Sequence, residues 1–172
     1  MTMGDRICVM KLGHIMQVDT PDNLYHKPKN MFVAGFIGSP EMNIRASKLV
    51  QQEGQLALTI GNQTMPLSPE LKEKVAGHAD KEIFYGIRPD FVSISDEPFA
   101  EGCCTGEMVR AENMGHEFFV YLKVGEYELT ARIPSDEAKP MINKGLHRKV
   151  YFNFDMNKCH IFDAKTEQNI SL

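Results

Sequence analysis

The sequence predicts a mainly β protein, a small barrel or sandwich with a short helical neck and an N-terminal β-hairpin. Stretches in which apolar and polar residues alternate recur at roughly 8–12-residue spacing, as in small all-β folds. Glycine-containing turns separate several of these stretches, and few segments show helical periodicity. The chain of 172 residues is 42% hydrophobic and 24% charged, which fits an ordinary globular fold and excludes a disordered one.

The first forty residues predict a hairpin followed by two small helices. Residues 7–10 and 15–18 are short apolar strands on either side of a turn sequence that contains Gly13. Thr20 and Asn30 are good helix N-caps, and Pro21 suits a first helical position. The first helix should end at Pro28 and the second at Gly38. The second helix, residues 31–37, is apolar on nearly every face, so we expect it to be buried on several sides.

From residue 41 the pattern becomes β, with one more helix. The expected strands are residues 55–60, 63–67 and 83–87, with a turn at Gly61-Asn62 between the first two. Between the last two strands, Ser68-Pro69-Glu70 predicts a helix start, and Gly77 predicts its end.

The second half of the chain repeats the β theme. The expected strands are residues 104–113, 118–124, 127–133, 150–154 and 159–162. Gly125-Glu126 places glycine first in a two-residue turn, as a type II′ hairpin requires.

Composition and motifs exclude several classes of function. The net charge of −4 is unfavourable for non-specific nucleic-acid binding, and no apolar stretch approaches the ~20 residues of a membrane span. The four cysteines form no C-x-x-C pair and no secretory signal is recognisable, so a reducing cytoplasm is expected. No phosphate-loop motif occurs, and the six histidines are scattered. We therefore predict no catalytic, cofactor-binding or metal-binding residue in this chain.

Two local patterns leave alternatives open. Cys103-Cys104 is read as a pair of reduced thiols where a loop enters a strand, with a strained vicinal disulfide as the alternative. Residues 147–154 mix basic and aromatic side chains, which could stack nucleic-acid bases. The acidic net charge favours the other interpretation, a core strand beside a basic loop.

One N-terminal string of residues is specific enough to indicate a family. Its members are Met3-Gly4-Asp5-Arg6-Ile7, Val9-Met10, Gly13, Ile15, Gln17-Val18, Thr20-Pro21, Leu24-Tyr25, Pro28, Asn30, Phe32-Val33-Ala34, Phe36-Ile37-Gly38-Ser39-Pro40 and Met42-Asn43. The string resembles the end of the ATPase domain in ABC-type importers of the maltose, multiple-sugar and glycerol-phosphate branch. Later motifs resemble the C-terminal regulatory region of the same family, a transport-associated domain of oligonucleotide-binding (OB) type. These motifs are Gly86-Ile87-Arg88-Pro89, Glu112-Asn113-Met114-Gly115-His116-Glu117, Phe154-Asp155 and His160-Ile161-Phe162-Asp163.

The resemblance implies a division of the chain and a set of partners. Residues 1–40 would end the ATPase domain, and residues 41–172 would form the OB-like regulatory domain. The family's ATP-binding motifs would lie before Met1, so ATP and Mg²⁺ belong to the longer parent protein and not to this chain. The family motif often continues with two acidic residues, whereas here Asp90 is followed by Phe91. Expected partners are a second copy, membrane permease subunits and a phosphotransfer regulatory protein, with no nucleic acid, at the cytoplasmic face of the membrane.

The leading functional hypothesis is therefore a regulatory and dimerisation region of a sugar importer ATP-binding subunit. A solute- or oxyanion-sensing barrel is the alternative, and a single-strand nucleic-acid-binding module is a weaker one. The orphan hairpin, or the barrels, should mediate self-association. The family-motif positions are Gly86, Arg88, Pro89, Glu112, Gly115, Phe154, Asp155 and Phe162.

Most of these positions are expected to be structural. Gly86 and Gly115 would meet backbone demands, Pro89 would fix φ, and Arg88 would tie loops together. Glu112 and Asp155 are the candidates for surface contacts.

Overall fold

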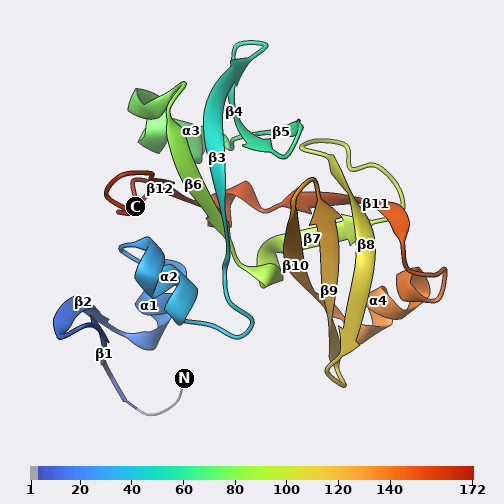
Figure 1. Cartoon of the computed structure of the whole chain (residues 1–172), viewed down its shortest axis with the longest axis horizontal. Helices are drawn as coiled ribbons and strands as arrows, with labels where there is room; N and C mark the ends of the chain where they lie inside the picture. The colour runs from blue at the N-terminus through green and yellow to red at the C-terminus, as the bar shows by residue number, and fades with distance from the viewer. Residues whose placement is uncertain (1–3) are drawn as a thin grey trace.

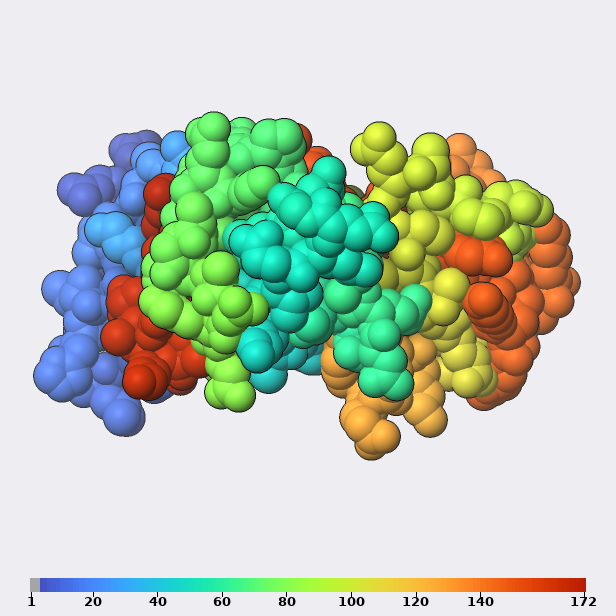
Figure 2. Space-filling model, turned by 90° about the horizontal axis from the view of Figure 1, so that it is seen from above, coloured from blue at the N-terminus to red at the C-terminus, as the bar shows by residue number. Residues whose placement is uncertain are grey.

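The computed structural model describes residues 4–172, so Met3 of the N-terminal motif lies outside the described residues. Two five-stranded antiparallel sheets dominate this part of the chain, and a separate hairpin with two helices precedes them (Figure 1). The expectation of a mainly β, OB-like fold with a helical neck is confirmed. Figure 2 shows the N-terminal residues at one end of the molecule, with the C-terminal residues beside them.

The N-terminal elements are those that local sequence predicts. They are β1 (Ile7–Lys11), β2 (His14–Asp19), α1 (Pro21–His26) and α2 (Met31–Phe36). The Thr20 hydroxyl accepts a hydrogen bond from Asn23 N at 3.3 Å, and the Asn30 side chain accepts one from Val33 N at 3.0 Å. The expected burial of α2 on several sides is only partly met: Val33 and Ala34 are buried, whereas Phe36 is 66% exposed.

The first sheet has the strand order β12-β6-β3-β4-β5. Its strands are β3 (Asn43–Gln52), β4 (Gln55–Ile60), β5 (Gln63–Pro66), β6 (Glu82–Ile87) and β12 (His160–Asp163), and α3 (Pro69–Val75) follows β5. Ser68 caps α3 as predicted, accepting from Leu71 N at 3.3 Å. The predicted stop at Gly77 is wrong in detail, because the helix continues as a 3-10 turn over Ala76–His78. Gly77 therefore does not adopt the left-handed conformation of a helix-ending glycine.

The second sheet has the order β10-β9-β8-β11-β7. Its strands are β7 (Val92–Ser95), β8 (Cys104–Asn113), β9 (Glu117–Val124), β10 (Tyr127–Pro134) and β11 (Arg148–Phe154), and α4 (Ser135–Ile142) follows β10. Val124 pairs directly with Tyr127, and Gly125 has φ +60° while Glu126 does not. This geometry fits the predicted type II′ turn and excludes type I′.

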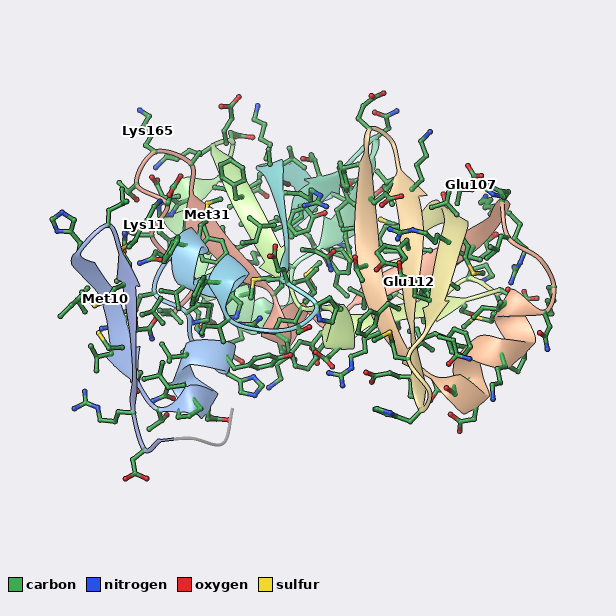
Figure 3. The ribbon with its side chains drawn as sticks, turned by 60° about the horizontal axis from the view of Figure 1, so that its bottom comes forward. Met10, Lys11, Met31, Glu107, Glu112 and Lys165 are labelled. Carbon is green, nitrogen blue, oxygen red and sulfur yellow. The ribbon has the colours of Figure 1, made fainter. Side chains whose placement is uncertain are left out.

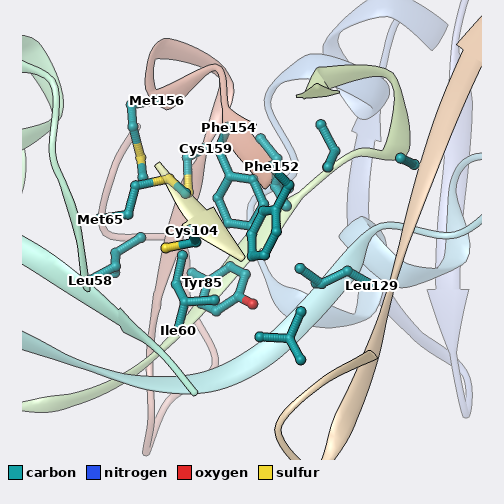
Figure 4. Packing of buried hydrophobic residues seen from close by; sticks show 14 of the residues in the cluster. Leu58, Ile60, Met65, Tyr85, Cys104, Leu129, Phe152, Phe154, Met156 and Cys159 are labelled. Atoms are coloured by element: carbon teal, nitrogen blue, oxygen red, sulfur yellow. The ribbon is translucent and has the colours of Figure 1, made fainter. Parts of the chain in front are cut away.

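The two sheets share one hydrophobic core (Figure 4). Tyr85 of the first sheet packs against Phe154 of the second, with ring centroids 5.7 Å apart. Cys104 and Cys159 are free thiols buried in this core, which agrees with reduced cysteines and not with a vicinal disulfide. Burial raises the pKa of each of these two thiols to about 12, so both stay protonated near neutral pH.

The second sheet curls so that its edge strands β10 and β7 come into contact, giving it a barrel-like form. Asn43, on β3 of the first sheet, is hydrogen-bonded to β10 of the second sheet. Its amide donates to Thr130 O at 2.8 Å and accepts from Thr130 N at 2.8 Å. At the other end of the molecule, Glu167 O accepts from Met31 N, and Lys29 O accepts from Asn169 N. The C-terminal tail is thereby fastened to the N-terminal helices.

Candidate functional site

Arg88 lies at the junction between the hairpin–helix segment (residues 4–40) and the β-rich remainder (residues 41–172). Its side chain follows the end of β6 and is 1% exposed. The guanidinium donates to Tyr25 O from Nε and Nη2, at 2.9 and 2.8 Å, and to Ile37 O from Nη1 at 2.6 Å. It also lies 3.8 Å from the centre of the Tyr25 ring. Arg88 thus uses its planar fork on backbone groups of the other segment.

Tyr25 extends this junction into a charged network. Its hydroxyl donates to one oxygen of Asp90 at 2.6 Å, and Arg132 donates to the other at 3.1 Å. Arg132 Nε also donates to Glu117 at 2.6 Å. Burial, and then the hydrogen bond with Asp90, raise the pKa of Tyr25 to about 12. The network therefore keeps Tyr25 as a hydrogen-bond donor and connects α1 to β9 and β10.

Gly86 lies in β6 beside this junction, and the requirement for glycine there is one of space. A Cβ at this position would lie 2.6 Å from the Met42 sulfur and 2.8 Å from the Phe162 ring. Its φ is not positive, so the expected demand on backbone conformation is replaced by close packing. Pro89 begins the 3-10 turn Pro89–Phe91, which presents Asp90 to Tyr25.

The remaining family-motif positions lie in other regions. Glu112 is on β8 of the second sheet, where it accepts from Tyr121 at 3.1 Å and pairs with Arg110 (Figure 3). Gly115, with φ +94°, forms the β8–β9 turn. Phe154 belongs to the core, and Asp155 caps the 3-10 turn Met156–Lys158 by accepting from Asn157 N at 3.1 Å. The structure brings together Gly86, Arg88, Pro89 and Phe162, and Asp155 N donates to Phe91 O at 3.0 Å, at the end of the turn that Pro89 begins. The functional roles of all eight positions remain predictions.

A cleft of about 520 Å³ opens next to Arg88, between the hairpin–helix segment and the β-rich part. Sequence reasoning missed it because its walls come from β2, α1, α3, β12 and the turn Met156–Lys158, which are distant in the chain. His160 lies in its wall and accepts a hydrogen bond at Nδ1 from the Asn169 amide at 3.2 Å. Burial, and then the charge of Arg88, lower the pKa of His160 to about 4.

Two further features are absent from residues 4–172. No group of three His, Cys, Asp or Glu side chains converges there as metal ligands would. Nor does any helix in the described part have the length and apolarity needed to cross a bilayer.

Comparisons with known proteins bear directly on this fold. Residues 38–92 match the family described as the MalK OB fold domain. The trehalose/maltose import ATP-binding protein MalK of Thermococcus litoralis is 39% identical over 178 residues, which cover 99% of this chain and 45% of that protein. The multiple sugar-binding transport ATP-binding protein MsmK of Streptococcus mutans is 37% identical, over 99% of this chain and 47% of that protein. The oligosaccharides import ATP-binding protein MsmX of Bacillus subtilis is 38% identical, over 99% of this chain and 46% of that protein.

The chain corresponds to the C-terminal part of ABC-type sugar importer ATP-binding proteins. It spans about half the length of these relatives. The family resemblance predicted from the sequence is thus confirmed, as is the presence of an OB fold domain. A solved structure of the cytoplasmic molybdate-binding protein ModG shares the fold, with a TM-score of 0.56 over 69% of this MalK-type chain and 94% of that chain. At 14% sequence identity, this likeness concerns the fold alone.

Proposed function

We propose that this chain is the C-terminal regulatory and dimerisation region of the ATP-binding subunit of a sugar ABC importer. The alignment of 99% of the chain with sugar-import ATP-binding proteins carries the proposal. In the longer protein, this region would couple ATP hydrolysis to transport, together with membrane permease subunits and a phosphotransfer regulatory protein. The subunit would lie at the cytoplasmic face of the membrane.

Residues 1–40 would complete the ATPase domain, and residues 41–172 would form the regulatory domain. The exposed apolar side chains of the hairpin, Met10, Leu12 and Ile15, support this division. Such exposed apolar groups are typical of a surface that packs against another part of a protein. ATP and Mg²⁺ would be bound by the longer protein. This chain contains no Gly-x-x-x-x-Gly-Lys-[Ser/Thr] sequence, so it offers no cradle for the phosphates and should not hydrolyse ATP by itself.

A chimera tests the coupling. The ATPase half of Bacillus subtilis MsmX is fused to residues 1–172 and expressed in a strain that lacks MsmX. We expect the chimera to restore oligosaccharide uptake, while MsmX truncated before the equivalent region does not. Failure of uptake by a chimera that is folded and hydrolyses ATP would contradict the proposal.

Dimerisation is tested on the 172-residue chain by sedimentation velocity over a range of protein concentrations. The exposed hairpin and its two unpaired strand edges support self-association. We expect the sedimentation coefficient to rise with concentration toward that of a dimer. A single monomeric species at high concentration would contradict this part of the proposal.

The oxyanion-sensing alternative rests on the fold shared with ModG, which is described as binding molybdate. Equilibrium dialysis against molybdate and sulfate distinguishes the two functions. Tight molybdate binding by the chain would favour a sensor, whereas no binding at millimolar concentration would remove the alternative.

A further inference from the structure

The cleft beside Arg88 is positively charged in a protein that is negatively charged as a whole. The net charge of the chain is −4. The walls of the cleft nevertheless carry more cationic than anionic groups. The cations are Lys27, Lys29, Lys74, Arg88 and Lys158, against the side chains of Asp19 and Glu70 and the terminal carboxylate of Leu172. A cleft with one predominant sign of charge concentrates ligands of the opposite sign.

Three of these cations are available to a ligand. Arg88 is occupied by the carbonyls of Tyr25 and Ile37, and Lys74 lies 3.3 Å from Glu70. Across residues 4–172, no ion pair involves the other three cations, which are Lys27, Lys29 and Lys158. Of the two side-chain carboxylates, Asp19 accepts hydrogen bonds from the Asn23 amide at 2.7 Å and from Thr20 N at 2.9 Å. These two donors partly compensate its negative charge.

The backbones that carry these lysines are held in place. Lys29 N donates to the buried Gln17 side chain at 2.9 Å, and Lys27 O accepts from the same side chain at 3.2 Å. Lys158 closes a 3-10 turn by donating from its backbone N to Asp155 O at 2.9 Å. The lysines therefore start from fixed backbone positions, Lys27 and Lys29 in the hairpin–helix segment and Lys158 in the β-rich part.

Rings and apolar groups form the rest of the cleft. The His26 and Phe91 rings lie 6.4 Å apart, and Lys158 Nζ is 5.9 Å from the centre of the Phe91 ring. Leu71 and Met156 add a buried apolar floor. The volume of about 520 Å³ lies within the range of small-molecule sites. Ring-bearing walls that also carry lysines without an ion-pair partner suit a ligand that combines a ring with a phosphate group.

We propose that this cleft binds a small organic phosphate, of the size of a mononucleotide or sugar phosphate, between lysines of both segments. The ring lies against Phe91 and His26, and the phosphate is shared by Lys29 on one wall and Lys158 on the other. Because the ligand touches both segments, its binding stiffens their junction. Binding does not depend on the importer function proposed above, since it concerns the 172-residue chain alone.

Isothermal titration calorimetry of the 172-residue chain tests the proposal with AMP and glucose 6-phosphate. Adenosine, glucose and inorganic phosphate are the comparison ligands. We expect at least one organic phosphate to bind clearly more tightly than its unphosphorylated partner and than inorganic phosphate. Its affinity should fall as salt concentration rises. The AMP and glucose 6-phosphate arms distinguish the two kinds of ring.

Substitution of the lysines locates the site. The double variant Lys29→Gln/Lys158→Gln should weaken binding by about tenfold or more, since each lysine contributes a charge-assisted contact. Lys123→Gln on β9 is the matched control, because Lys123 is exposed and does not line the cleft. No binding at millimolar concentration, or equal affinity of the control and double variants, would overturn the proposal. Sugar uptake by the chimera would be unaffected by that outcome, so failures of the two proposals can be told apart.

Discussion

Arg88 connects two segments of the chain through hydrogen bonds to the backbone carbonyls of Tyr25 and Ile37. A lysine at this position keeps the charge but lacks the planar fork, and it can reach at most one of the two carbonyl groups. We expect Arg88→Lys to lower the free energy of unfolding by about 2–3 kcal/mol, because a buried carbonyl loses its donor. Urea denaturation measures this change, and Arg6→Lys at an exposed position should leave stability unchanged. Equal stability of both variants would contradict the assigned role.

His160 should make stability depend on pH in the acidic range. Its pKa in the folded protein is lowered to about 4, against about 6.5 in the unfolded chain. Between these values the unfolded state binds a proton that the folded state does not, so stability falls as the pH is lowered from about 6.5 toward 4. The contribution of His160 to that loss should be about 3 kcal/mol.

Denaturation curves at several pH values test this expectation. His160→Asn keeps an acceptor near the Asn169 amide but does not titrate, so it should flatten the slope over this range. His14→Asn, on the exposed hairpin, is the control and should retain the wild-type slope. An unchanged slope in His160→Asn would show that His160 is not responsible.

Gly86 and Gly77 test whether glycine is required for space. Gly86→Ala would force its Cβ against Met42 and Phe162, and we expect a loss of about 2–3 kcal/mol from overpacking. At Gly77 a Cβ meets nothing within 4 Å and φ is not positive. Gly77→Ala should therefore be neutral or slightly stabilising, because it restricts the unfolded chain. Thermal unfolding of both variants measures the contrast, and a similar effect of the two would contradict it.

The β1–β2 hairpin is the element with the most exposed apolar surface. Met10, which is labelled in Figure 3, lies opposite Ile15 across the two strands. Met10 and Ile15 are 53% and 64% exposed, and Leu12 at the tip is 92% exposed. Ile15→Lys should reduce self-association, because it places a charge in the centre of this face. Sedimentation velocity measures the change. Leu146→Lys alters an exposed leucine far from the hairpin, and loss of association in that variant alone would assign the interface elsewhere.

Elements with strong local signals could be predicted from the sequence, and elements fixed by tertiary contacts could not. The caps at Thr20, Asn30 and Ser68 and the turn at Gly125 depend on neighbouring residues only. By contrast, β3 was missed because it buries few of its ten residues, among them Asn43 and Leu49. The helix α4 was also missed. It has Pro134 at its N-cap and Pro140 inside it, and these two prolines obscure the helical pattern.

In the candidate site, too, the local motif could be predicted from the sequence and the tertiary contacts could not. The motif around Arg88 is visible in the sequence, and that Arg88 ties loops together stays a prediction. Its three hydrogen bonds go to α1 and to the C-cap of α2. Its acceptors are the carbonyls of Tyr25 and Ile37, and a backbone carbonyl leaves no mark in a sequence. The hydrogen bond between Tyr25 and Asp90, and the position of Lys29 and Lys158 in the wall of one cleft, bring together residues that are distant in the sequence.

At the scale of the whole molecule, a small number of contacts couple the hairpin–helix segment to the β-rich part. One group of contacts is formed by Arg88 and the Tyr25–Asp90 bond. In a second group, the Asn169 amide donates to Pro28 O at 2.8 Å while its backbone N donates to Lys29 O at 2.9 Å. These contacts stabilise the small N-terminal segment, whose own core is a cluster of only a few buried side chains.

We therefore expect the wild-type chain to unfold in a single transition and the double variant Arg88→Ala/Asn169→Ala to lose this cooperativity. Without the two side chains, the N-terminal segment should open at a lower free energy than the β-rich core. Hydrogen exchange measured by mass spectrometry should show faster exchange over α1 and α2, with β9 and β10 still protected. Arg110→Ala, on the exposed face of β8, is the control and should leave both regions as in the wild type. Uniform loss of protection in the double variant would mean that the two segments form one cooperative unit, with no separable junction.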